Sequence, residues 1–357
     1  MAQRKLIILT EGHSDPHTAK TACSVIRYRR DEVVAVLDST LVGQDVSESL
    51  GVGQGLTMVS SLDAAADANC LLIGIAPPGG KIPAAWRVIV LDAISRGMDI
   101  ISGLHDFLSD DDEFVIAAEA NSIELIDVRK NDITTIARRP GFREGCFRVH
   151  TVGHDCSVGK MVVAIEITKG LQQRGIDAKF CATGQTGIMI EDAGYPMDRV
   201  ISDFVSGATE RLMLESESHD VLVVEGQGSL VHPSYSAVTL GILHGCLPHA
   251  LVLCYEVLRD AVTGVEHVKI PDLPEVKAIY EMMASIYQPC EVVAVAMNSR
   301  RVDEEAATAE RERVREQLQL PVTDIFRYGS DDIVEAVMAA RERWLANPSE
   351  QAGERWN

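Results

Sequence analysis

The sequence predicts an α/β protein of two domains, each built around a parallel β-sheet. Short apolar runs alternate with stretches of helical periodicity along most of the 357 residues, and this alternation favours parallel strands joined by right-handed crossover helices. The length suffices for two domains with separate cores. The pattern breaks at residues 138–141, Arg-Arg-Pro-Gly, which is the candidate linker. We therefore expect domains at residues 1–140 and 145–345.

The composition limits the classes of partner. A net charge of −20, with 46% hydrophobic residues, repels both a nucleic-acid backbone and an anionic bilayer. We expect small-molecule ligands, no nucleic acid and no membrane partner. No apolar run reaches about 18 residues and no signal peptide begins at Met1, which predicts a cytoplasmic protein. Soluble enzymes of this size are mostly symmetric homo-oligomers, so we expect one here.

The first domain is predicted to be a Rossmann-like layer. Its expected strands are the apolar runs at residues 5–10, 33–37, 70–75, 99–102 and 124–128, and helices are expected at 18–30 and 84–96. The first strand leads into a loop with the single glycine Gly12. Because dinucleotide binding uses three glycines in the pattern G-x-G-x-x-G, the sequence does not predict a dehydrogenase.

The second domain begins with a strand, a glycine-bounded loop and a helix. Such a loop aims consecutive backbone N–H groups, the positive end of a helix dipole and a lysine ammonium at one point, so it is predicted to bind phosphate. Five residues separate its two glycines, one more than in the standard P-loop. The loop residues are Gly153, His154, Asp155, Cys156, Ser157, Val158, Gly159, Lys160 and Met161.

Met161 stands where the standard loop has a Ser or Thr whose hydroxyl binds Mg²⁺. A thioether cannot replace that hydroxyl on a hard cation. The loop is therefore predicted to hold phosphate, and the use of Mg²⁺ stays open. His13 and His17 have the spacing of a zinc helix, but Pro16 lies between them. We expect no protein-bound metal.

Further along the second domain, polar residues follow apolar runs. Strands are expected at 178–182, 221–224, 249–254, 292–298 and, at an edge, 321–326, with a helix at 203–218 and a solvated helix at 303–317. Glu225 ends the second of these strands and is expected over the phosphate loop. Arg259 and Asn298 follow or end the later strands. Ligands bind outside the carboxyl ends of parallel strands, so these side chains should face one crevice.

Two further residues of this region have the chemistry of catalysis. His232 follows the glutamate turn and is either a proton carrier or a polar loop residue. Cys156 precedes a helix N-terminus with a lysine nearby, which lowers a thiol pKa. An acyl-cysteine and a small loop residue are both open for this position. The other seven cysteines have no C-x-x-C pairing and are predicted to be buried thiols.

The motifs together resemble the D-glutamate N-acetyltransferase family, P-loop proteins with a Rossmann-like N-terminal domain; the loop by itself is similar to that of dethiobiotin synthetase. The resemblance covers the whole chain and rests on five stretches: residues 77–80, residues 103–105, the loop at 153–161, the helix start at 203–208, and residues 225–233. It implies transfer of an acetyl group from acetyl-CoA to D-glutamate. It further implies a partner enzyme that acts on N-acetyl-D-glutamate in D-amino-acid catabolism.

That reaction needs a base, because the amine must lose a proton before it attacks the thioester. Glu225 is the first candidate, followed by Asp155 and His232. Coenzyme A carries phosphates that the loop can hold without a Mg²⁺ ligand. The expected substrate-binding residues are Gln227, Arg259, Asn298 and Asp203. The alternatives are an ATP-dependent ligase of the dethiobiotin synthetase type and a nucleotide- or CoA-sensing protein without turnover.

Overall fold

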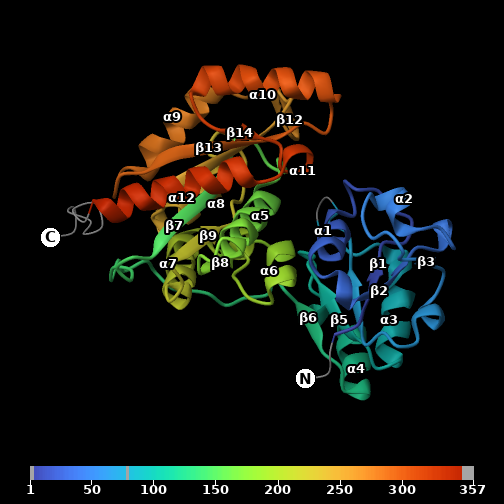
Figure 1. Cartoon of the computed structure of the whole chain (residues 1–357). Helices are drawn as coiled ribbons and strands as arrows, with labels where there is room; N and C mark the ends of the chain where they lie inside the picture. Colours follow the sequence, from blue (N-terminus) through green and yellow to red (C-terminus); the bar gives the residue numbers. More distant parts are fainter. Residues whose placement is uncertain (1–3, 78–79, 348–357) are drawn as a thin grey trace. The chain divides into compact units, whose positions relative to one another are not determined.

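The computed structural model describes residues 4–77 and 80–347 (Figure 1). The chain divides into two compact units, one formed by Met1–Lys130 with Ile188–Asp192 and the other by Asn131–Gly187 with Ala193–Asn357. The boundary after Lys130 precedes residues 138–141, so these residues are part of the second unit.

The first unit contains a six-stranded parallel sheet in the order β3-β2-β1-β4-β5-β6. The order reverses beside β1, as in Rossmann folds, and confirms the predicted fold class. The strands are β1 (Leu6–Leu9), β2 (Val33–Leu37), β3 (Met58–Val59), β4 (Cys70–Ile73), β5 (Asp99–Ser102) and β6 (Leu125–Asp127). The α-helices are α1 (Lys20–Tyr28), α2 (Val46–Leu50), α3 (Arg87–Ser95) and α4 (Asp112–Asn121).

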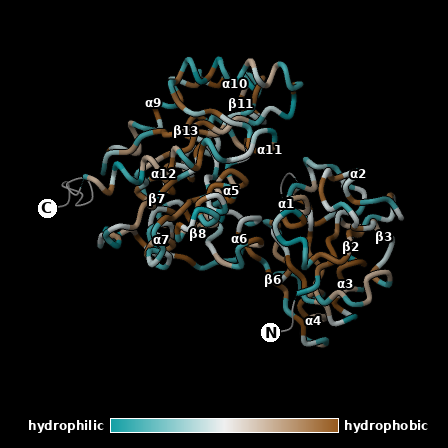
Figure 2. Tube along the Cα trace, in the orientation of Figure 1, coloured by the Kyte–Doolittle hydropathy of each residue, from teal (hydrophilic) through white to brown (hydrophobic). Residues whose placement is uncertain are grey.

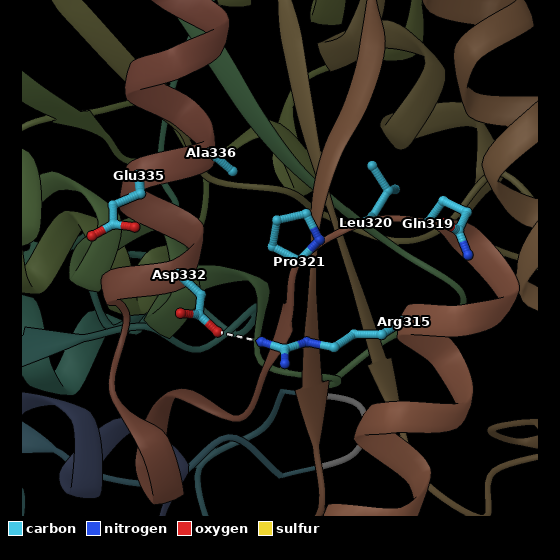
Figure 3. A pocket seen from close by; sticks show the side chains of 7 residues that line it. All are labelled: Arg315, Gln319, Leu320, Pro321, Asp332, Glu335 and Ala336. Atoms are coloured by element: carbon cyan, nitrogen blue, oxygen red, sulfur yellow. Dashed lines mark hydrogen bonds and ion pairs between the residues drawn. The ribbon is translucent and has the colours of Figure 1, made fainter.

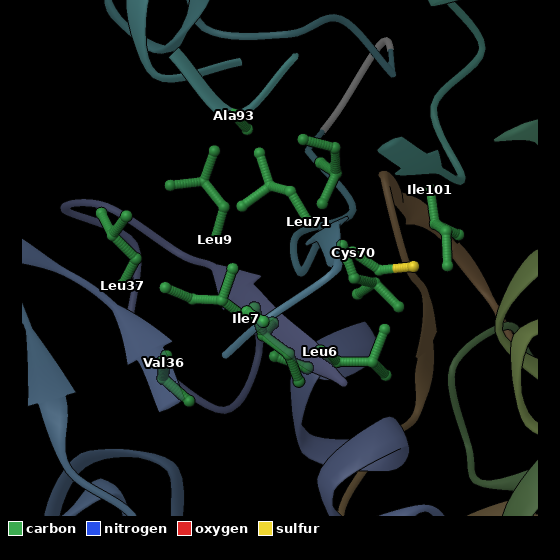
Figure 4. Packing of buried hydrophobic residues seen from close by; sticks show 14 of the residues in the cluster. Leu6, Ile7, Leu9, Val36, Leu37, Cys70, Leu71, Ala93 and Ile101 are labelled. Carbon is green, nitrogen blue, oxygen red and sulfur yellow. The ribbon is translucent and has the colours of Figure 1, made fainter. Parts of the chain in front are cut away.

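The strands of the first unit are apolar because they lie in its hydrophobic core. All four residues of β1 are at most 1% exposed, because a central parallel strand is covered by helices on both faces. Figure 4 shows these side chains packed against residues of β2, β4 and α3. Burial of each such Leu or Ile side chain contributes about 1.5–3 kcal/mol.

The second unit contains another six-stranded parallel sheet, in the order β14-β13-β10-β7-β9-β8. Its strands are β7 (Phe147–Gly153), β8 (Ala178–Cys181), β9 (Val221–Val224), β10 (Ala250–Glu256), β13 (Glu291–Asn298) and β14 (Val322–Thr323). The predicted edge strand at 321–326 is shorter than expected, because the short helix α11 (Ile325–Tyr328) follows at once. A small antiparallel hairpin, β11 (Ala261–Val262) with β12 (Val265–Lys269), was not predicted.

Helices cover both faces of this sheet. The helices α5 (Lys160–Gln173) and α12 (Asp331–Ala346) pack on one face, whereas α7 (Val205–Ser216), α8 (Ser236–Cys246) and α9 (Leu273–Ala284) pack on the other. The predicted solvated helix is α10 (Glu304–Leu318), which buries only Ala307 and Val314 and is largely hydrophilic in Figure 2. No helix in the described part of the chain is both long and apolar enough to cross a membrane.

The topology of the second sheet positions the candidate site. The chain leaves β7, forms β8 at one edge, returns to β9 beside β7 and then forms β10 on the other side of β7. Such a reversal opens a crevice at the carboxyl ends of the strands. The segments that follow β7, β9 and β10 therefore meet at one edge of the sheet.

Candidate functional site

The loop between β7 and α5 has the backbone of an anion-binding loop. Ser157 and Gly159 adopt left-handed conformations, with φ of 55° and 109°, and Gly159 is the residue before the first turn of α5. Left-handed residues in such a loop turn neighbouring N–H groups toward one side. Gly159 has the conformation that only glycine adopts without strain. The helix N-terminus adds its positive dipole end at the same place.

Lys160 is buried and lies over its own loop. Its Nζ donates a hydrogen bond to the carbonyl oxygen of Asp155 at 2.8 Å, and burial lowers the pKa of its ammonium. The lysine stem also passes close to Gly226, where an added Cβ would lie 2.8 Å from Lys160 Cδ and 1.9 Å from the carbonyl oxygen of Thr151. A side chain at Gly226 is excluded, so the loop and the turn after β9 approach each other closely.

Asp155 is fully buried, and both of its carboxylate oxygens accept hydrogen bonds. Its Oδ1 accepts from Cys156 N at 2.7 Å, and its Oδ2 accepts from Thr263 N at 3.0 Å, Thr263 Oγ1 at 2.7 Å and Arg259 Nη1 at 3.0 Å. Burial by itself raises the pKa of this carboxyl, but the hydrogen bonds from Thr263 and Cys156 and the charge of Arg259 outweigh it and lower the pKa. An ionised carboxylate held in this way is a weak base.

The two histidines near the loop are also engaged. Ser234 N donates to His232 Nδ1 at 3.1 Å, so we assign the ring proton to Nε2, which lies 3.2 Å from the carbonyl oxygen of Thr263. His154 accepts from Glu256 N through Nε2 at 3.1 Å. Burial lowers the pKa of His154 to about 3. Both rings orient the chain around the loop, and both nitrogens of His232 have partners.

Glu225 differs from Asp155 and the two histidines, because its pKa is raised. It directly follows β9, is 3% exposed, and its Oε2 accepts from Thr183 N at 2.8 Å and Gly184 N at 3.0 Å. Burial raises the pKa of this carboxyl to about 7. An added Cβ on Gly187 would lie 2.4 Å from Glu225 Oε2, so the turn at 183–187, which includes the start of the helix α6 (Gln185–Glu191), closes on the carboxylate only because it carries glycine there. The result is an acid poised near neutrality beside the loop.

The raised pKa of Glu225 predicts a pH-dependent stability. Protonated Glu225 contributes stability that is fully present below its ordinary pKa of 4.5 and is lost as the pH rises through about 7. Glu225→Gln stays neutral throughout. The variant should therefore gain unfolding free energy relative to the wild type between about pH 5 and about pH 8, by up to about 3 kcal/mol. Urea unfolding at several pH values measures this difference, and a constant difference would contradict it.

The predicted substrate-binding residues Arg259, Gln227 and Asn298 have different partners in the structure. Arg259 donates to Asp155 and, at 2.7 Å, to the carbonyl oxygen of Cys156, and it pairs with Glu256, so its side chain is only 7% exposed. Gln227 Nε2 donates to Thr183 Oγ1 at 3.3 Å, next to Glu225. Asn298 Oδ1 accepts from the backbone N–H of Arg300 at 3.3 Å. Their roles toward substrate stay predictions.

Asp203 lies apart from the other candidates. It is exposed in the 3₁₀ turn Ser202–Phe204 that precedes α7. Within residues 4–77 and 80–347, none of the hydrogen bonds found joins it to the loop or to the turn after β9. A helix start that looks like a motif in the sequence therefore does not bring Asp203 to Glu225 through direct contact.

One group of side chains has the residue types of a metal site. Asp155, Cys156 and His232 each offer a ligand atom, and the three atoms lie within 4.8 Å of one another. Arg259 lies 3.0 Å from the same carboxylate, and both ring nitrogens of His232 already have partners. The positive charge of Arg259 repels a dication, and the ring nitrogens of His232 are already engaged in hydrogen bonds, so the group does not suit a divalent metal. Cys156 is half-buried, and the acyl-cysteine stays a prediction.

Several contributing residues were missed by the sequence analysis. Thr263, at the turn of the hairpin, binds Asp155 through both its N–H and its hydroxyl. Tyr280 donates to the carbonyl oxygen of Gly153 at 2.9 Å and accepts from Leu230 N at 3.0 Å. The Thr-Gly pair between two apolar segments is a hairpin signal that could have been used, whereas nothing local marks Tyr280.

A surface hollow elsewhere in the second unit is a weaker candidate. It has a volume of about 440 Å³ and lies between the end of α10 and α12, with Arg315 paired to Asp332 at 2.7 Å (Figure 3). Its residues Leu320 and Pro321 precede β14. The hollow is therefore at the amino ends of the strands, whereas ligands of parallel sheets bind at the carboxyl ends.

Comparison with known proteins supplies the family. Residues 39–131 match a Rossmann-like domain and residues 135–334 match a P-loop domain, the two parts of the DUF1611 family, described as domains of unknown function. A D-glutamate N-acetyltransferase of Tritonibacter scottomollicae is 37% identical over 95% of this chain and 100% of its own. Another of a Pseudoalteromonas species is 37% identical over 82% of this chain and 89% of its own.

A solved structure agrees with these matches. The crystal structure of a DUF1611 family protein from Anabaena variabilis is 34% identical and covers 94% of this chain and 99% of that chain, with a TM-score of 0.88. Both domains and nearly the full length are thus shared with the relatives. The chain therefore belongs to the DUF1611 family, whose two curated relatives above are named D-glutamate N-acetyltransferase, and it is an acyltransferase.

Proposed function

We propose that this protein transfers the acetyl group of acetyl-CoA to the amine of D-glutamate and releases N-acetyl-D-glutamate and CoA. The names of its relatives support the acceptor. The observation that carries the proposal is Glu225, a buried carboxyl with a pKa of about 7 beside an anion-binding loop. Acetyl transfer to an amine needs a base near neutrality and a site for a phosphate-bearing donor, and the chemistry of Glu225 and of the loop supports these two roles.

The loop suits CoA as the donor. Its N–H groups, the start of α5 and the Lys160 ammonium attract phosphate without a metal. Met161 removes the hydroxyl that Mg²⁺ chemistry uses, but thioester transfer involves no phosphoryl group and does not need it. Phosphate binding requires that the Lys160 ammonium exchange its hydrogen bond with Asp155 O for one to the ligand.

Glu225 is the best placed base of the three candidates. Hydrogen bonds and the charge of Arg259 lower the pKa of Asp155, which makes it a weak base, and His232 has partners on both nitrogens. Glu225 takes one proton from the ammonium of the acceptor, the freed nitrogen attacks the thioester carbonyl, and the carbon–sulfur bond breaks as CoA thiolate leaves. The attacking nitrogen loses its second proton as the amide forms, this proton goes to the departing thiolate, and Glu225 releases its own proton to solvent, so atoms and charges balance.

The proposed reaction implies a further step in metabolism. Acetylation neutralises the amine of a D-amino acid, and we propose that a second enzyme processes N-acetyl-D-glutamate in a catabolic sequence in the cytoplasm. A symmetric homo-oligomer is part of the same proposal, on the base rate for such enzymes.

A thiol-release assay tests the proposed function. Purified protein is mixed with acetyl-CoA and D-glutamate, without ATP or Mg²⁺, and free thiol is followed against an L-glutamate control. We expect thiol release with the D-amino acid and little with its mirror image. Absence of release, followed by ADP formation once Mg-ATP and a carboxylate substrate are supplied, would replace the transferase by a ligase.

A further inference from the structure

Three arginines converge on one buried carboxylate near the loop. Glu256, the last residue of β10, has a fully buried side chain. Its Oε1 accepts from Arg300 Nε at 2.5 Å, and its Oε2 pairs with Arg259 and, at 3.4 Å, with Arg301 Nη2. One carboxylate cannot neutralise three guanidinium groups. The arrangement therefore leaves positive charge at the carboxyl ends of β10 and β13.

The other acidic side chains near this corner are not paired with Arg300 or Arg301 in the interactions found among the described residues, and the buried Asp324 instead accepts from the N–H and the hydroxyl of Ser299. Asp155 takes part of the charge of Arg259, while Lys160 adds another cation on the loop side. Asp303 caps α10 by accepting from Ala306 N at 2.9 Å, and Glu304 pairs with Arg327 at 2.8 Å. A cationic corner in a chain with a net charge of −20 concentrates anions where it lies.

Arg300 and Arg301 are the accessible part of this corner. Their side chains are 47% and 49% exposed, against 7% for Arg259. Arg300 uses Nε on Glu256, and in the hydrogen bonds described for this chain its two terminal nitrogens have no acceptor. Glu256 thus holds one edge of the guanidinium and leaves the other edge for an anion. A fixed guanidinium of this kind suits a phosphate oxygen pair.

The corner is connected to the loop by direct contacts. Arg259 Nη1 donates to the carbonyl oxygen of Cys156 inside the loop, and its other terminal nitrogen pairs with Glu256, which in turn binds Arg300. Two side chains therefore separate the loop from Arg300. In CoA the 5′-pyrophosphate and the 3′-phosphate are attached to one ribose, so a donor of this kind presents its two anionic groups to neighbouring sites such as the loop and this corner.

We infer that Arg300 and Arg301 bind the 3′-phosphate of CoA while the loop binds the pyrophosphate, an inference that rests on the proposed acetyl-CoA donor. The pair makes the protein discriminate CoA from donors that lack this phosphate. Arg259 does not belong to this phosphate site, because its guanidinium is already paired with Asp155 and Glu256. It holds the loop in place instead.

Calorimetry with CoA and 3′-dephospho-CoA tests this site without turnover. The wild type should bind CoA about 10- to 100-fold more tightly, since charge-assisted hydrogen bonds to one phosphate are lost in the analogue. Arg300→Gln with Arg301→Gln should reduce CoA affinity to the level of the analogue and leave the affinity for the analogue unchanged. Arg343→Gln, which removes an exposed cation paired with Glu291, is the matched control.

The outcomes separate the two proposals. Equal losses for both ligands in the double variant, or a wild type without preference for CoA, would overturn the 3′-phosphate site. CoA preference without acetyl transfer would refute the proposed function and leave the 3′-phosphate site standing. Acetyl transfer with equal affinity for CoA and the analogue would refute the 3′-phosphate site and leave the proposed function standing.

Discussion

Glu225→Gln is expected to lower kcat by about 10²- to 10⁴-fold, the usual contribution of a positioned general base. The amide is nearly the same shape and its oxygen still accepts from Thr183 N and Gly184 N, so the turn at 183–187 keeps its place. The amide cannot take a proton from the acceptor amine. Initial rates of thiol release at saturating acetyl-CoA and D-glutamate measure the loss, and calorimetry should show unchanged CoA affinity.

The pH dependence identifies the group responsible. Because burial raises the pKa of Glu225 to about 7, wild-type kcat should rise as the pH passes through about 7, when the carboxylate form accumulates. The residual rate of the variant should lack this rise. A matched control is Glu215→Gln, an exposed carboxyl on α7 paired with Arg211. Retention of the rise in Glu225→Gln would assign the base to another residue.

Lys160→Met is expected to weaken CoA binding by about 100-fold, because it removes the ammonium that pairs with phosphate. Methionine keeps an unbranched stem in the narrow space beside Gly226, so the fold of the loop is little disturbed. Calorimetry gives the affinity, and its salt dependence should be smaller in the variant because one ionic contact is gone.

The control for the loop is a lysine away from it. Lys277→Met on α9 removes a cation that pairs with Glu281 at 2.8 Å and should leave CoA affinity close to that of the wild type. If Lys160→Met also binds CoA with wild-type affinity, the loop does not hold the donor and the proposed site is wrong.

The sequence predicted the parts of the site that depend on local pattern. Mostly apolar runs of four to eight residues in β9, β10 and β13 identify buried parallel strands, and the rule that ligands lie at their carboxyl ends placed Glu225 at the same edge of the sheet as the loop. The left-handed glycine and the helix start made the loop recognisable. These features are fixed by residues close together in the chain, and this is why they were accessible.

The features that the sequence did not predict depend on contacts between distant residues. Arg259 was expected to bind substrate, yet Asp155, which lies 104 positions earlier, occupies its guanidinium. Thr263 satisfies the same carboxylate from a hairpin of two short strands, and strands of two and five residues leave little periodicity to detect. Asp203 belongs to a familiar motif, but the motif does not specify the distance between its turn and the site.

Tyr280 has a consequence for any redesign of this enzyme. One buried hydroxyl binds the carbonyl oxygen of Gly153, where the loop begins, and the N–H of Leu230, in the segment that follows Glu225. The loop assigned to the donor and the segment that follows the base are therefore both hydrogen-bonded to one residue of α9, Tyr280. A variant library that changes the loop to accept a bulkier acyl donor must keep the Gly153 carbonyl in place, or it will also displace the segment after the base.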